Sequence, residues 1–171
     1  MNITNESEEF IVQSISHMKE NTPRIEKCLA QLSDEEVWKR PNQNSNSVGN
    51  LILHLCGNIT QYILSSLGGV PDFRIRKEEF SAREGYTRDQ LLDKIKTTVN
   101  AATEVIRNLD RKELLRPREV QGFDITGIGI IIHVVEHYSY HTGQIAFWTK
   151  LLKNKDLDFY EGVDLNKKNI E

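Results

Sequence analysis

Hydrophobic residues recur with the period of an α-helix along much of the chain. Residues 6–31 predict one long helix, and Pro23 removes a backbone donor inside it, so we expect a bend or an interruption there. The apolar positions of this helix are Phe10, Ile11, Ile15, Met18, Ile25, Cys28 and Leu29. Residues 32–47 are rich in Asn, Ser and Pro, which predicts a loop around a short helical turn, anchored by Trp38.

Capping residues mark the starts of three further helices. Ser47 can cap a helix that ends at a Gly-Gly pair, and Thr87 with Gln90 forms a capping-box pattern before an amphipathic stripe. Thr126 can cap the last helix. We therefore expect helices over 48–67, 88–109 and 127–153.

These elements predict an all-α, four-helix bundle that forms a single domain over residues 1–171. The connection Gly68–Tyr86 is too long for an antiparallel turn, and stretched out it can run back along a whole helix. Helices two and three are then parallel, which gives an up-down-down-up bundle with a long crossover. Residues 110–125 are expected to be irregular, with a weak strand pattern near 120–125, and the polar tail 154–171 to be loosely ordered.

Composition and charge narrow the environment and the partners. The 171 residues contain 22 Lys and Arg against 25 Asp and Glu, a net charge of −3, with both signs interspersed. This balance supplies no basic surface for nucleic acid or anionic lipid, and no apolar run is long enough to span a membrane. Cys28 and Cys56 have no disulfide-like or C-x-x-C spacing. We expect a cytoplasmic protein without nucleic-acid or membrane partners.

Histidines carry the clearest chemical signal. His133, His137 and His141 follow one another at intervals of four residues, so they share one face of the last helix. Two imidazoles at positions i and i+4 are a standard pair of ligands for a divalent metal ion. His54, on the otherwise apolar second helix, is the expected third ligand. A polar seam on the same side of that helix comprises Asn50, Asn58 and Gln61.

Spacing alone does not decide which pair of histidines on the last helix binds the metal ion. His133 to His137 also spells H-x-x-E-H, the motif of inverted zinc proteases, in which Glu136 would be the general base. Such enzymes take a further carboxylate ligand from a downstream helix, and only Glu161 and Glu171 follow, both in the tail. This alternative is therefore the weaker one.

Three segments together resemble the DinB/YfiT-like family of metal-dependent proteins: HVVEHYSYHTGQIAFW, SNSVGNLILHLCGNI and GGVPDFRIRKEEF. The most specific part is the H-x-x-x-H-x-G-Q run from His137 to Gln144. The resemblance implies an up-down-down-up bundle, commonly a homodimer, with a zinc or nickel ion held by His54, His137 and His141. Some members use low-molecular-weight thiols as cosubstrates. We expect the dimer interface to be formed by helix one and by the aromatic end of helix four, which carries Phe147 and Trp148.

Several other residues are candidates for roles near such an ion. Gln144 is placed to orient a ligand imidazole, and Glu136 and Tyr140 are weaker acid or base candidates. Asn58 and Gln61 are expected to line the site. Arg74 and Arg76, in the crossover, are candidates for binding an anionic group of a substrate.

Two small residues complete the expectations for the site. Gly143 is expected at a close helix contact, because a glycine within a helix is costly without such a reason. Cys56 lies on the opposite face of its helix from His54 and should point away from the ion.

The expected function is therefore that of a metal-dependent enzyme, a hydrolase or a thiol transferase, acting on a small molecule. The alternative is a non-catalytic metal-binding bundle with a structural or sensor role. Structural zinc usually has four protein ligands, often including Cys, and this sequence offers three histidines, which favours catalysis.

Overall fold

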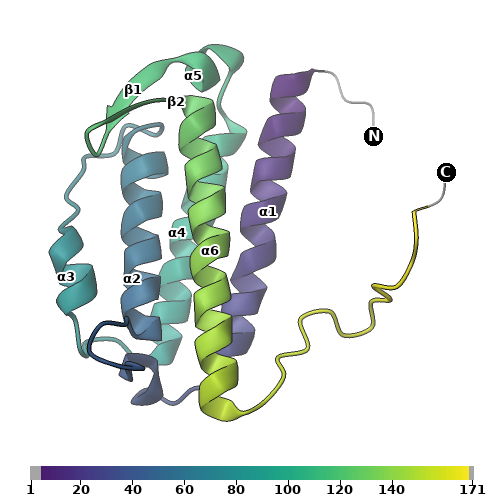
Figure 1. The fold of residues 1–171 in the computed structure, drawn as a ribbon. Helices are drawn as coiled ribbons and strands as arrows, with labels where there is room; N and C mark the ends of the chain where they lie inside the picture. Colours follow the sequence, from purple (N-terminus) through teal and green to yellow (C-terminus); the bar gives the residue numbers. More distant parts are fainter. Residues whose placement is uncertain (1–4, 170–171) are drawn as a thin grey trace.

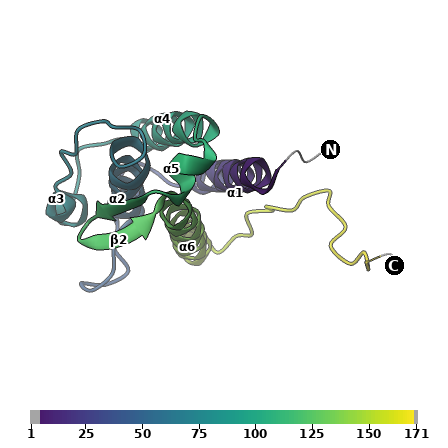
Figure 2. The same ribbon diagram turned by 90° about the horizontal axis from the view of Figure 1, so that it is seen from above.

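The structure is a computed structural model, and it describes residues 5–169 of the chain. Four long helices lie side by side and form a bundle, with a small hairpin across one end (Figure 1; Figure 2 views the bundle from above). The helices and strands are α1 (Glu6–Leu29), α2 (Val48–Ile59), α3 (Arg76–Ser81), α4 (Arg88–Arg107), α5 (Arg111–Leu115), β1 (Pro117–Val120), β2 (Phe123–Thr126) and α6 (Gly127–Lys153). A 3-10 turn covers Glu36–Trp38, and a π-helical turn, Thr60–Ser65, continues α2.

The expected capping residues begin the helices as predicted. Ser47 accepts a hydrogen bond from the backbone of Asn50, whose side chain bonds back, and Thr87 and Gln90 form the same reciprocal pair. The side chain of Thr126 accepts from the backbone N–H of Gly129 at the start of α6. The all-α bundle is therefore confirmed, and α1 continues through Pro23 without interruption.

The parallel arrangement of α2 and α4 is also confirmed. The start of α4 lies at the end of the bundle where α2 begins: the Trp38 indole donates to the Tyr86 carbonyl at 3.0 Å, and the Arg88 amide donates to the Asp34 carboxylate at 2.8 Å. The chain between the two helices runs back along the outside of α2 and carries α3 (Figure 1). The bundle is therefore up-down-down-up, with the crossover at Gly68–Tyr86.

The segment 110–125 is more regular than expected. It forms α5 and an antiparallel hairpin in which Pro117 pairs with Thr126 and Val120 with Phe123. Gln121 and Gly122, between the strands, have φ angles of 55° and 81°, the left-handed values that tight two-residue hairpins require. Strands of four residues show too little alternation to be recognised, so the expectation of an irregular segment was wrong here.

The core lies between the four long helices and is formed mainly by aliphatic side chains. Tyr138, on α6, is fully buried among them, and its hydroxyl lies 3.0 Å from the Thr22 hydroxyl on α1. After α6 the chain returns to α1: Leu157 is buried, and the Asp158 carbonyl accepts a hydrogen bond from Lys27. In the part of the chain that the structure describes, no helix is long and apolar enough to cross a membrane.

Candidate metal centre

Three imidazoles meet in the space between α2 and α6. His54 reaches this space from α2, and His137 and His141 reach it from successive turns of α6. The Nε2 atom of His137 lies 3.1 Å from Nε2 of His54 and 3.1 Å from Nε2 of His141. The ligand nitrogens of all three lie within 4.8 Å of one another.

This convergence fits a common ion. Nitrogens bound at 2.0–2.1 Å in a tetrahedral site are about 3.3 Å apart, close to the separations of His137 from its two neighbours. Nitrogen lone pairs facing one another at this distance repel unless a proton or a cation lies between them. The donor set therefore fits a divalent ion that accepts imidazole ligands.

A carboxylate from the crossover orients the imidazole of His54. Oε2 of Glu79, on α3, lies 2.9 Å from Nδ1 of His54, so this carboxylate accepts the Nδ1 proton and leaves Nε2 as the free lone pair. Arg74 donates to both oxygens of Glu79, from Nε at 2.7 Å and from Nη2 at 2.9 Å. Metal-ligating histidines commonly carry such a carboxylate partner.

Glu79 is held ionised although it is buried. Burial raises the pKa of its carboxyl, but the hydrogen bonds and charge of Arg74, together with the hydrogen bond from His54, outweigh this effect and lower the pKa below its usual range. The side chains of Arg74 and Glu79 are only 3% and 10% exposed. Their ion pair is therefore shielded from solvent and keeps a negative charge beside His54.

Asn50 and Gly57, both on α2, determine where α3 and Glu79 lie. The Asn50 side-chain amide donates to the backbone carbonyls of Glu79 and Ala82, both at 2.9 Å, which fixes α3 against α2. A Cβ on Gly57 would lie 2.0 Å from Oε1 of Glu79. Only glycine at this position therefore leaves room for the carboxylate.

The imidazole of His141 has its own partner. Its Nδ1 lies 2.7 Å from Oε1 of Gln144, which again leaves Nε2 free to face the other two imidazoles. The ring of Tyr140 packs edge-on against His141 with the centroids 5.0 Å apart. Nδ1 of His137 is buried and has no hydrogen-bond partner among the described residues.

The histidines on α6 are held in the neutral form. Burial and the neighbouring imidazoles lower the pKa of His137 to about 3, and burial also lowers the pKa of His141 and of His133. A neutral imidazole is the form that binds a metal ion. His137 and His141 are therefore ready to bind an ion at neutral pH without first losing their positive charge.

His133 lies outside the converging group. Its ring stacks on Tyr62 at 4.3 Å between centroids, and its Nε2 lies 3.2 Å from the side-chain amide of Asn58. Glu136, the base in the inverted-protease alternative, is exposed. The structure thus brings together His137 and His141 with His54, and leaves His133 in a neighbouring contact.

The remaining sequence candidates contact the periphery of the cluster rather than its centre. Asn58 is engaged with His133, and Gln61 accepts from Arg74 at 2.9 Å and donates to Asp72 at 2.8 Å. Arg74 is hydrogen-bonded to Glu79. Arg76 is exposed, and its guanidinium lies 4.7 Å from the centroid of the Phe80 ring.

Sequence reasoning missed Glu79. The rule that a ligand histidine needs an acceptor for its other ring nitrogen calls for a carboxylate. The crossover offers four carboxylates, Asp72, Glu78, Glu79 and Glu84, and the sequence contains nothing to choose between them.

Comparisons with known proteins agree with this fold. Residues 5–161 match the model of a family described as "Protein of unknown function (DUF1572)". The chain belongs to this family. A comparison with curated proteins gives no match.

Two of the solved structures that are similar to this chain are described as DinB-like proteins. A DinB-like protein, YjoA, from Bacillus subtilis superposes with a TM-score of 0.66 at 18% identity, covering 86% of this chain and 97% of its own. A DinB-like protein from Bacillus cereus gives 0.64 at 18% identity, covering 83% and 90%. A conserved protein from Enterococcus faecalis gives 0.69 at 16% identity, covering 84% and 96%. The DinB-like fold that the resemblance implies is confirmed.

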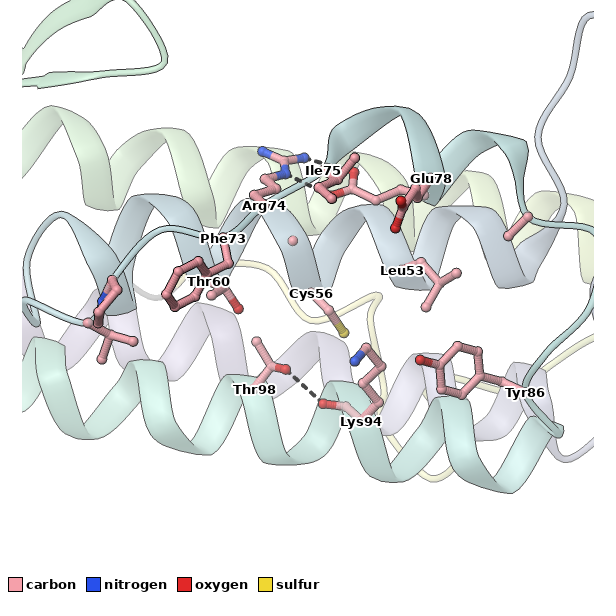
Figure 3. Close-up of a pocket in the computed structure, with 15 residues that line it drawn as sticks. Leu53, Cys56, Thr60, Phe73, Arg74, Ile75, Glu78, Tyr86, Lys94 and Thr98 are labelled. Carbon is pink, nitrogen blue, oxygen red and sulfur yellow. Dashed lines mark hydrogen bonds and ion pairs between the residues drawn. The ribbon is translucent and has the colours of Figure 1, made fainter.

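A cavity of about 570 Å³ adjoins the Arg74–Glu79 pair on the side away from the histidines. It lies between α2, the crossover and α4, and Figure 3 shows Phe73 and Lys94 pointing into it from opposite sides. The Cys56 thiol lines this cavity and is not among the converging ligand atoms, and burial raises its pKa to about 11.

A second hollow, of about 680 Å³, runs along the last turns of α6 beside the loop 41–46. Gly143 lines it, and a Cβ there would meet no described atom within 4 Å apart from the neighbouring backbone of α6. The expectation that Gly143 makes a close helix contact was therefore wrong. A glycine within a helix costs ~1 kcal/mol relative to alanine, and no contact within the described chain accounts for this cost.

Proposed function

We propose that this DUF1572 protein binds one divalent metal ion through His54, His137 and His141 and is a metal-dependent enzyme acting on a small molecule. The observation that carries the proposal is the convergence of three Nε2 atoms, with His54 and His141 each oriented through Nδ1 by a partner side chain. An ion held by three imidazoles supplies a Lewis acid with a position free for a further ligand.

The side chains around the histidines have distinct tasks in this proposal. Glu79 holds the proton on Nδ1 of His54 and increases the basicity of Nε2, while Gln144 holds the ring of His141. Arg74 keeps Glu79 ionised rather than binding an anionic substrate. Tyr140, which is 61% exposed and packs beside His141, is a candidate to exchange a proton with a bound molecule.

The family resemblance supports zinc or nickel as the ion and either hydrolysis or transfer of a low-molecular-weight thiol as the reaction. The alternative is a structural or sensor ion in a non-catalytic bundle. Structural zinc sites usually have four protein ligands, and the cluster found in residues 5–169 has three. This count favours catalysis.

Elemental analysis of the purified protein and its variants tests the ligand set. We expect one metal ion per chain in the wild type, loss of the ion in His141→Ala, and full retention in His133→Ala. If His133→Ala loses the ion while His141→Ala keeps it, the pair is His133 and His137, and the inverted-protease alternative becomes the better one.

Cobalt substitution tests whether a coordination position is open. In the proposed open site, the d–d spectrum changes when a small thiol or imidazole is added, and it titrates between about pH 6 and 9. A spectrum that ignores every added ligand and does not titrate in this range indicates a site saturated by protein groups. Catalysis at the ion would then be abandoned in favour of a structural role.

We also propose a homodimer in the cytoplasm. Val12 on α1 and Ile132 on α6, in neighbouring helices, are 42% and 52% exposed and supply apolar surface for a second copy. At the end of α6, Trp148 is only partly buried, with its indole donating to the Lys39 carbonyl, and Phe147 lines the hollow over Gly143. Sedimentation giving about twice the chain mass of 19.7 kDa supports the dimer, and the monomer mass contradicts it.

A further inference from the structure

Gly143 differs from the other four glycines of α2 and α6. A Cβ on Gly49, Gly57, Gly127 or Gly129 would lie 2.8, 2.0, 2.5 or 2.6 Å from a neighbouring atom, so packing explains each of them. A Cβ on Gly143 would meet no atom of residues 5–169 within 4 Å apart from the neighbouring backbone of its own helix, and the backbone of Gly143 is that of the surrounding helix. Neither packing nor backbone conformation accounts for a glycine at this position.

The hollow over Gly143 has apolar and polar sides but no charged lining. On the α6 side Tyr140, Phe147 and Leu151 are 61%, 70% and 62% exposed. The rest of the lining includes Leu51 of α2 and the loop 41–46, most of whose lining side chains carry amide or hydroxyl groups. The loop residues that line it are Pro41, Asn42, Asn44, Ser45 and Asn46. Such a lining suits an uncharged molecule, because it has no ion to pair with a charged one.

The spacing of the aromatic residues leaves room for a ring. Tyr140 and Phe147 are seven residues apart on α6, about 10 Å along the helix axis, and Gly143 lies between them. A side chain at position 143 would fill this interval. With glycine, a flat group can lie directly on the helix backbone.

Gln144 connects this hollow to the histidines. Its Oε1 is engaged with Nδ1 of His141, while its NH₂ group has no hydrogen-bond partner among the described residues. That NH₂ group is a donor for an acceptor atom on a molecule in the hollow. Occupancy of the hollow and the position of the His141 ring are therefore linked through one side chain.

We propose that the hollow over Gly143 binds the substrate of the metal site, and that this substrate carries an uncharged planar ring with a hydrogen-bond acceptor. The ring lies on Gly143 between Tyr140 and Phe147, and the acceptor receives the NH₂ group of Gln144. This inference rests on the proposed function, since it names the class of molecule that the metal site acts on.

Three probes of similar shape test the chemistry of the hollow: neutral benzamide, anionic benzoate and cationic benzamidine, titrated into the zinc-loaded protein and followed by ¹H–¹⁵N NMR. We expect benzamide to bind with a Kd of about 1 mM, as befits a small fragment, and to shift the resonances of Gly143 and Gln144. Benzoate and benzamidine should bind several-fold more weakly. Tighter binding of either ion, or no shifts with benzamide, overturns the proposal.

Gly143→Ala tests the site itself. The added methyl should weaken benzamide binding about tenfold, leave the zinc content unchanged, and raise Tm by about 2–4 °C because alanine favours the helix. The control Ser139→Ala, at an exposed position of α6 outside the hollow, should leave the affinity unchanged. Unchanged benzamide affinity in Gly143→Ala overturns the proposal.

Two further measurements separate this proposal from the others. Sedimentation of the wild type and of Gly143→Ala shows whether a second copy fills the hollow: dissociation of a dimer by this variant would assign the surface to that contact and overturn the substrate proposal. If the protein binds no zinc but the metal-free protein still binds benzamide as expected, the proposed metal function fails while the hollow remains a binding site.

Discussion

Oε2 of Glu79 lies 2.9 Å from Nδ1 of His54, although the two residues are 25 positions apart and the start of the crossover lies between them. The contact joins the segment outside the bundle to a ligand candidate inside it. The crossover is therefore part of the candidate site and not only a connection between two helices.

Replacing Glu79 with Gln should weaken zinc binding. The amide can still accept the proton of His54 Nδ1, but it has no charge to increase the basicity of Nε2. We expect a loss of about 10-fold or more in affinity, measured by competition with a chromophoric chelator. Glu78→Gln is the matched control, since Glu78 is the exposed neighbour on α3 and makes no hydrogen bond to His54. Equal affinities in the two variants would show that the carboxylate does not support the site.

Gly57→Ala should destabilise the protein and reduce zinc affinity together. Its Cβ would lie 2.0 Å from Oε1 of Glu79, so the carboxylate must move away from His54. Overpacking of this kind costs about 1–3 kcal/mol, which urea denaturation can measure. Gly143→Ala makes the same chemical change in open space on α6 and should be stabilising. A neutral or stabilising effect of Gly57→Ala would contradict the close packing of Glu79.

Zinc should stabilise the wild-type protein and not His54→Ala. An ion that binds only the folded chain contributes about 2.7 kcal/mol at a free concentration of 100 times Kd. For a domain of this size, that corresponds to a rise in Tm of about 5–10 °C. Calorimetry with and without zinc measures the shift. A similar rise in His54→Ala would indicate binding elsewhere on the chain.

The metal-free protein should lose stability in mild acid. The folded-state pKa of His137 is lowered from 6.5 to about 3, so below pH 6.5 the unfolded chain binds a proton that the folded chain does not. The contribution of this imidazole to the free energy of unfolding is therefore fully present above pH 6.5. It is lost as the pH falls toward about 3, by up to about 1.4 kcal/mol per pH unit.

Urea denaturation of the chelator-treated protein at a series of pH values tests this expectation, with His137→Phe for comparison. The variant lacks the group that titrates, so its stability should depend less on pH. His17→Phe is the control, because His17 is on the exposed face of α1, with a side chain that is 62% exposed. Identical pH profiles for the wild type and His137→Phe would contradict the lowered pKa.

Much of the fold could be predicted because its signals are local. Ser47, Thr87 and Thr126 begin helices through contacts with residues three positions away, which the sequence displays directly. The parallel placement of α2 and α4 follows from chain length alone. The hairpin β1–β2 depends instead on a two-residue turn and on packing at the end of the bundle. Its strands have only four residues each, which is too short for an alternating hydrophobic pattern to be recognised in the sequence.

The histidines of the site could be predicted for the same reason, and their partners could not. Residues four apart on a helix share a face whatever the rest of the chain does, so His137 and His141 meet by necessity. Glu79 reaches His54 only because Asn50 fixes α3 and Gly57 leaves space, and these are contacts over long sequence separations. The expectation of a close helix contact at Gly143 was wrong because the sequence does not distinguish a helical glycine that faces another helix from one that faces open space.

The separation of 83 positions between His54 and His137 has a consequence for the lifetime of the folded protein. The three imidazoles can meet only after α2 and α6 have packed together, late in folding, because contacts across so long a loop form slowly. An ion bound there strengthens contacts that the folding transition state has not yet made. It should therefore slow unfolding and leave the folding rate nearly unchanged. The metal-loaded chain would then persist longer against proteolysis that acts through unfolding, even at equal rates of synthesis.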